Sequence, residues 1–155
     1  MRLPINDLCQ LKSSARNASR VKYGLANRNG HMKAETGHII FKDKFRWKDL
    51  HGCFEELLRA FLGETDQMPD EDEILQMFIR INMMDIEKNR KPEGYNRRGR
   101  MRLVFPLTPG RKQFYIRADS KTAETIRITE RLSKILKKAG IHHTVEWDKL
   151  KSHEP

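Results

Sequence analysis

Residues 47–63 read WKDLHGCFEELLRAFLG, and apolar side chains recur in this stretch at helical spacing before the closing glycine. The recurring positions are Trp47, Leu50, Phe54, Leu57, Leu58 and Phe61. This spacing places them on one face of a helix, and glycine is the commonest residue just after a helix C-terminus. We therefore predict a helix over 47–63 that buries this face and ends near Gly63.

Other segments alternate apolar and polar side chains, as half-buried strands do. From Gly37 onward the apolar positions are Ile39, Phe41 and Phe45, and later runs comprise Met101, Leu103, Phe105 and Leu107, then Phe114, Ile116 and Ala118. The turn sequence Thr108-Pro109-Gly110 separates the last two runs, which predicts a β-hairpin. Pro106 has no N–H to donate, so its strand is expected at a sheet edge or with a bulge.

The stretch after the hairpin predicts a second amphipathic helix. Its apolar face comprises Ile128, Leu132, Ile135, Leu136 and Ala139. Asp119 or Ser120 can cap its N-terminus, and Gly140 can end it. Residues 141–147 then alternate again and predict a closing strand.

Residues 75–83 fit two interpretations. Apolar side chains alternate strictly at Leu75, Met77, Ile79, Ile81 and Met83, which indicates a strand. Pro69, followed by the acidic residues 70–73, is also a good start for a helix. We predict a strand here and keep a helix as the alternative, which would make the fold a more helical α+β protein.

The resulting order is strand, helix, strand, basic loop, hairpin, helix, strand. Two strand–helix–strand halves of this kind form an α+β, ferredoxin-like (split βαβ) fold, in which two helices pack on one face of a mainly antiparallel sheet. The long connection between Met83 and Met101 is expected to project as a basic hairpin arm. Because many functions use this architecture, the function must be inferred from side chains.

The 155-residue chain has a formal net charge of +10. Its length suits one domain, which we place at residues 37–155 behind a basic N-terminal arm of residues 1–36. The charge is uneven, since residues 64–87 hold eight acids and one cation whereas residues 88–118 hold ten cations and one acid. A cationic segment of this kind favours a polyanionic partner: nucleic acid, an anionic membrane surface or an acidic protein.

Cysteine content and the chain start bear on the compartment. Cys9 and Cys53 form no disulfide framework and no metal-ligand spacing, which favours a reducing, cytoplasmic location. The chain shows no secretory signal and no apolar run of membrane-spanning length, so we expect no membrane partner. Its acid-poor start weakly resembles a mitochondrial transit composition, which leaves organelle import as a minor alternative.

The loop of residues 88–102 is the main candidate for nucleic-acid binding. Its cations are Lys88, Arg90, Lys91, Arg97, Arg98, Arg100 and Arg102, and Arg111 and Lys112 follow in the hairpin turn. Arginine forks bind phosphates bidentately, and the glycines at 94 and 99 let the backbone approach a ligand. Tyr95 can stack on a base, and Tyr115, on the strand face opposite Phe114, is a second stacking candidate.

Catalytic residues are few. His142, His143, Glu146 and Asp148 could ligate a metal, but alternation along a strand places His142 and His143 on opposite faces. The carboxylates Asp70, Asp72, Glu73, Asp85 and Glu87 lack a recognisable nuclease spacing. We therefore expect no metal and no cofactor.

These patterns together predict a non-catalytic protein that binds DNA or RNA through the phosphate backbone, alone or as a subunit of a nucleoprotein complex with protein partners. A first alternative is a protein-interaction subunit whose basic loop binds an acidic partner. A second is a small metal-dependent nuclease.

Overall fold

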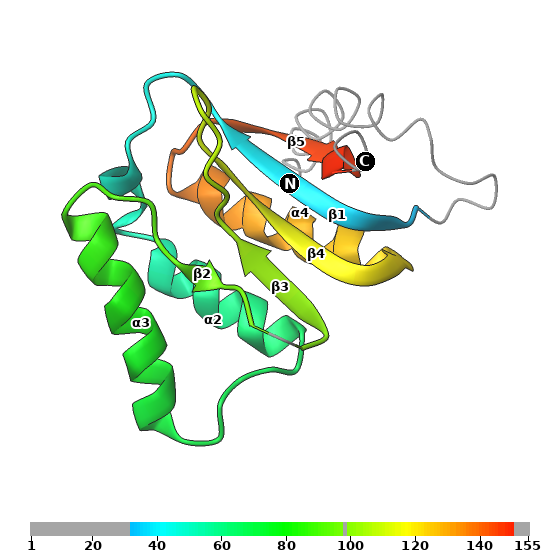
Figure 1. The fold of residues 1–155 in the computed structure, drawn as a ribbon, viewed down its shortest axis with the longest axis horizontal. Coiled ribbons are helices and arrows are strands. Elements are labelled where there is room, and N and C mark those ends of the chain that lie inside the picture. Colours follow the sequence, from blue (N-terminus) through cyan, green and yellow to red (C-terminus); the bar gives the residue numbers. More distant parts are fainter. Residues whose placement is uncertain (1–31, 98, 151–155) are drawn as a thin grey trace, which may run out of the picture. The chain divides into compact units, whose positions relative to one another are not determined.

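The computed structural model describes residues 32–97 and 99–150, which fold into an antiparallel five-stranded sheet with three α-helices and a 3-10 helix (Figure 1). The elements in chain order are β1 (Ala34–Phe41), η1 (Trp47–Leu50), α2 (Phe54–Glu64), α3 (Asp72–Glu87), β2 (Gly94–Tyr95), β3 (Met101–Val104), β4 (Gln113–Thr122), α4 (Ala123–Lys138) and β5 (His143–Trp147). The strands lie in the order β2-β3-β4-β1-β5. The predicted α+β class is confirmed.

One core joins the sheet to α2 and α4, which lie behind it in Figure 1. The predicted core positions Trp47, Leu50, Phe54, Leu57, Phe61, Leu132, Ile135 and Leu136 are all buried. Gly37 of β1 lets α4 come close, because a Cβ at this position would collide with the Thr129 side chain. The amphipathic faces predicted for both helices are therefore confirmed except at Ala139, which is exposed and follows the last residue of α4.

The strand predicted for residues 75–83 is wrong, because these residues lie within the helix α3. Its buried positions are Leu75, Ile79, Asn82 and Ile86, which follow the helical period. Asp72 and Glu73 lie in its first turn, where acidic side chains stabilise the positive end of the helix dipole. The helix alternative is the one observed.

The predicted hairpin arm is not confirmed, because part of its chain packs at the edge of the sheet. Gly94 and Tyr95 pair with Val104 and Leu103 of β3. The buried Asn82 of α3 holds this edge: the Gly94 N–H donates to Asn82 Oδ1 at 2.7 Å, and Asn82 Nδ2 donates to the Gly94 carbonyl at 3.4 Å. Gly94 has a φ of +75°, a conformation that favours glycine.

Several predicted boundaries shift. β1 begins at Ala34, inside the predicted N-terminal arm, and residues 1–31 of that arm lie outside the described residues. A 3-10 turn and residues 51–53 precede α2, so the helix predicted over 47–63 is shorter and continues one residue past Gly63. Thr122 caps α4, because β4 extends through Asp119 and Ser120.

The end of the first hairpin strand also differs from its prediction. β3 stops at Val104, two residues before Pro106, which cannot donate a ladder hydrogen bond. Phe105 remains in the core, but Leu107 lies beyond the strand and is 88% exposed. The apolar alternation in the sequence therefore extends beyond the end of the strand.

Candidate nucleic-acid interface

Two arginines face each other across the hairpin, on the sheet face opposite α2 and α4. Met101, Leu103 and Ile116 point into the core, so Arg102 and Arg117 project from the other side. The two arginines are register partners between β3 and β4. Like charges directly opposite each other destabilise a sheet unless a partner neutralises them. An acid does lie close to one member of the pair, since the Glu35 carboxylate is 3.9 Å from the Arg117 guanidinium.

Tyr115 lies beside this arginine pair. It precedes Arg117 by two residues on β4, so both side chains share one sheet face. Its register partners are Val104 on β3 and His38 on β1, and its ring centroid is 5.0 Å from that of His38. The tyrosine is half-buried, which leaves part of its ring able to stack on a base.

More cations gather at the end of the sheet where β4 begins. Arg111 and Lys112 are exposed in the turn before β4, and the Phe41 N–H donates to the Lys112 carbonyl at 3.0 Å. This bond places Lys42, the next residue after Phe41, beside that turn. The basic surface therefore continues from the turn onto the β1 end.

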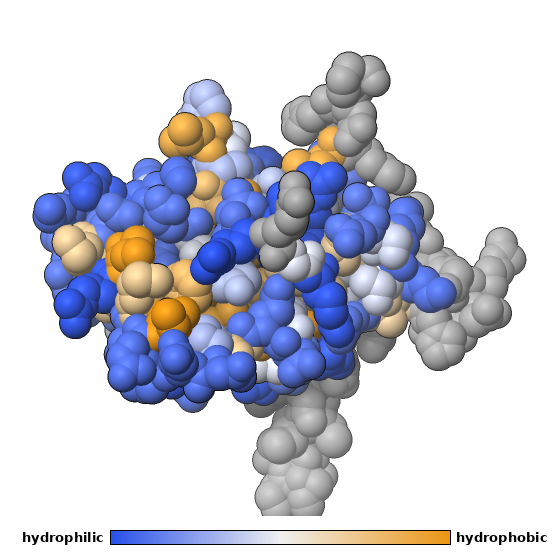
Figure 2. Space-filling model, turned by 60° about the horizontal axis from the view of Figure 1, so that its bottom comes forward, coloured by the Kyte–Doolittle hydropathy of each residue, from blue (hydrophilic) through white to orange (hydrophobic). Residues whose placement is uncertain are grey.

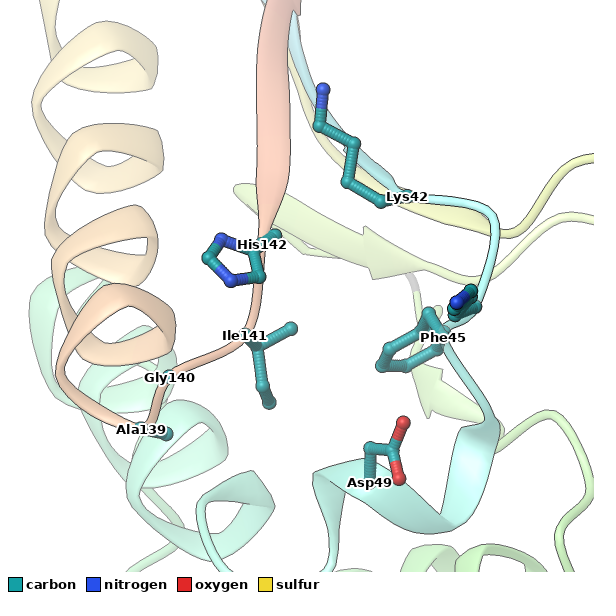
Figure 3. Close-up of a pocket in the computed structure, with 8 residues that line it drawn as sticks. Lys42, Phe45, Asp49, Ala139, Gly140, Ile141 and His142 are labelled. Atoms are coloured by element: carbon teal, nitrogen blue, oxygen red, sulfur yellow. The ribbon is translucent and has the colours of Figure 1, made fainter.

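An open pocket of about 410 Å³ lies at this same end (Figure 3). Lys42, Lys44 and His142 line it together with the apolar residues Phe45 and Ile141. The acid in the wall, Asp49, is bonded to Arg46. The charged residues of the wall are thus two lysines and one aspartate that is already bonded to Arg46, within a lining that also carries apolar surface.

His38 lies beside its register partner Tyr115, on the same face of the sheet, and is neutral at pH 7. Burial lowers the pKa of its imidazole to about 4, and the Arg111 charge acts in the same direction. Nε2 accepts from the Lys149 N–H at 3.3 Å and lies 2.9 Å from the Thr36 hydroxyl. Because the ring is buried, a charge on it would lose its hydration, so protonation opposes the folded state.

We expect stability to fall on acidification because of His38. Its folded pKa of about 4 lies below the unfolded value near 6.5, so only the unfolded chain gains the proton between these pH values. The contribution of His38 to the free energy of unfolding is fully present above pH 6.5. It falls by about 1.4 kcal/mol per pH unit as the pH decreases to 4. Urea unfolding of wild type and His38→Gln at pH 7 and 5 tests this. An equal loss of unfolding free energy between pH 7 and 5 in both proteins would contradict this prediction.

The loop cations predicted from sequence do not form one cluster. Arg90 is 3.1 Å from Asp85, and Arg100 is 2.6 Å from Glu124 of α4, so acids partly neutralise both. The Arg97 guanidinium lies over the Phe78 ring, 5.2 Å from its centroid. Lys88 caps the C-terminus of α3, Lys91 is half-buried in the connection to β2, and Arg98 lies outside the described residues.

Tyr95 packs differently from its predicted stacking role. Its ring contacts Phe78 edge-on at 5.4 Å between centroids and also lies near Phe61. Of the predicted loop residues, Arg102 projects from the sheet face that carries Tyr115. Arg117 was not among the predicted residues, although alternation from Tyr115 and the hairpin register place it opposite Arg102.

The structure also pairs a serine and a histidine that sequence reasoning did not connect. Ser133 Oγ is 2.7 Å from His143 Nε2, and His143 Nδ1 is 2.8 Å from the Ile141 carbonyl oxygen. The carbonyl can only accept, so Nδ1 carries the proton and the serine hydroxyl donates to Nε2. Ser133 is buried between α4 and the sheet, which denies a substrate access to it. The pair therefore fastens β5 to α4.

His142 lies apart from this pair, exposed in the pocket wall. In residues 32–97 and 99–150, no three His, Cys, Asp or Glu side chains gather closely enough to hold a metal ion. Within the same ranges, no helix is both long and apolar enough to cross a membrane. Burial raises the pKa of the Cys53 thiol to about 11, so it is protonated at neutral pH.

Comparisons of the chain with protein-family models, curated proteins and solved structures find no match.

Proposed function

We propose that this protein binds DNA or RNA through phosphate contacts, without catalysing a reaction, alone or as a subunit of a nucleoprotein complex. The observation that carries the proposal is the register pair Arg102–Arg117 beside Tyr115. Two guanidinium groups held on a rigid sheet can grip neighbouring phosphates, and an adjacent tyrosine can stack on a base. A bound polyanion would remove the repulsion between the two arginines.

The charges around this pair define the proposed path of the ligand. Arg111 and Lys112 extend the cationic surface past one end of β4, and Lys42 continues it. The predicted loop cations that the structure describes are a second set in the chain on either side of β2: Lys88, Arg90, Lys91, Arg97 and Arg100. The opposite sheet edge is less suitable, because Glu146 and Asp148 lie there at the end of β5.

We also propose that the ferredoxin-like arrangement underlies this surface. The order β3-β4-β1-β5 supports it, since the units β1-α2-β3 and β4-α4-β5 interleave as two split βαβ halves. In this interpretation α3 and β2 are an insertion in the first half. Placing both crossover helices on one face leaves Arg102, Tyr115 and Arg117 on the opposite face, where each is at least partly exposed.

The test is binding of the full chain to a labelled DNA duplex, single-stranded DNA and single-stranded RNA of unrelated sequences. We expect binding to all three, with log affinity falling against log salt by about 0.9 per phosphate contact on duplex DNA and about 0.7 on single strands. Fluorescence anisotropy between about 50 and 200 mM salt gives this slope. No binding at the lowest salt would reject the proposal and favour an acidic protein partner.

A further inference from the structure

The helix α3 has a second apolar face that the core does not use. Leu75, Ile79 and Ile86 are buried, whereas Ile74, Met77, Ile81 and Met84 on another face are 37–50% exposed. We call these four exposed residues the α3 stripe. Figure 2 shows hydrophobic side chains interrupting a hydrophilic surface on the side of the molecule where α3 lies.

The spacing of the stripe suits another helix. Positions 74, 77, 81 and 84 are separated by three, four and three residues, which is the a/d repeat of a coiled-coil seam. Such a seam accepts side chains of a facing helix as knobs, and flexible methionines adapt to their shape. Half of the stripe is methionine. The 16-residue helix is about 24 Å long, enough for two heptads of contact.

The charges beside the stripe select the partner. Acids flank it at Asp70, Glu71, Asp72, Glu73, Asp85 and Glu87, and Arg80 is the cation within the helix. Asp85 is bonded to Arg90, and Glu87 lies 3.6 Å from His51, but the four acids at the N-terminal end form no ion pair among the described residues. This surface repels nucleic acid and anionic lipid and attracts cationic side chains.

A second copy of the chain fits less well. In an antiparallel pair centred on Ile79, Ile74 would meet Met84 and Met77 would meet Ile81, which is good apolar contact. The same pairing sets Glu73 opposite Asp85 and Glu71 opposite Glu87 of the other copy, so that acids meet acids at both ends. Like-charge flanks of this kind select against self-pairing in coiled coils.

We propose that the α3 stripe docks an amphipathic helix of another protein, with apolar residues in a heptad repeat and Lys or Arg beside them. The apolar contact supplies the binding energy, and the acidic flanks supply specificity for a basic partner. This surface is distinct from the arginine pair on the sheet, so it does not depend on nucleic-acid binding.

The probe is a synthetic helical peptide of about four heptads, with Leu at a and d and Lys at e and g. A second peptide carries Glu at e and g. We expect the wild-type protein to bind the lysine peptide, to bind it more weakly as salt rises, and to bind the glutamate peptide at least tenfold more weakly. Labelled peptide anisotropy measures each affinity.

The variant Met77→Ser/Ile81→Ser should weaken binding of the lysine peptide at least tenfold with only a small fall in melting temperature, because the two side chains are 45% and 43% exposed and lie outside the core. Leu107→Ser is the matched control, an apolar-to-polar change at an exposed site away from α3, and it should leave the affinity unchanged. An equal loss in the control, no loss in the stripe variant, or no binding by wild type would overturn the proposal. Wild-type dimers that the stripe variant abolishes would instead identify a second copy as the occupant.

Discussion

Leu132→Ala is expected to lower the free energy of unfolding by about 2–5 kcal/mol. Leu132 is fully buried where α4 packs on the sheet, so truncation removes apolar contact and leaves a cavity that the surrounding helix and strands can fill only in part. Leu57→Ala on α2 should fall in the same range, because that side chain is 1% exposed in the same core.

Urea denaturation of the wild type, Leu132→Ala and Leu57→Ala gives these differences in the free energy of unfolding directly. Leu107→Ala is the control, since its side chain is 88% exposed and its loss should change stability by no more than about 0.5 kcal/mol. A loss at Leu132 as small as that of the control would mean that the helix-to-sheet core does not carry the stability of this fold.

The two core helices were predictable because their apolar faces repeat over several turns. Trp47, Leu50, Phe54, Leu57 and Phe61 leave no strand interpretation, and the α4 positions repeat in the same way. The capping residues near the helix ends predicted the helix boundaries less well. Asp119 and Ser120 resemble caps, but the pairing of β4 with β1 and β3 extends the strand past them, so tertiary contact decides where α4 begins.

The failure at α3 has a specific physical cause. Leu75 and Ile79 belong to the face that packs on the core, whereas Met77 and Ile81 belong to the exposed stripe. Taken together along the chain, the two faces produce a perfect alternation that imitates a strand. An amphipathic helix with one buried face would not give this pattern. The prediction failed where the helix carries apolar residues that folding of this chain alone does not require.

The candidate interface was only partly visible in the sequence. Local charge density marked the 88–102 loop, but it could not reveal that Arg100 pairs with Glu124, 24 residues away, or that Tyr95 packs on Phe78. Those contacts depend on tertiary folding. The Arg102–Arg117 pair depends on hairpin register, and a register follows from alternation once the turn is known.

Arg102→Gln/Arg111→Gln/Arg117→Gln is expected to cause the largest loss of nucleic-acid affinity. Each lysine or arginine on a phosphate releases counterion and contributes about 0.9 to the salt slope on duplex DNA. If all three touch phosphate, the slope should flatten by about two to three units, and affinity near 0.1 M salt should fall roughly 10²–10³-fold. The loss should be similar for unrelated sequences, because phosphate contacts carry no base information.

A matched control separates local contact from net charge. Arg46→Gln/Arg59→Gln/Arg131→Gln removes the same three charges from arginines that already pair with Asp49, Glu55 and Glu64. These surface pairs contribute little to stability, so both triple variants should remain folded by circular dichroism. Net charge alone would weaken both variants equally. A large loss confined to the first triple would assign the phosphate contacts to the β3–β4 face, whereas unchanged affinity in that triple would move them to the cations of the 88–100 segment.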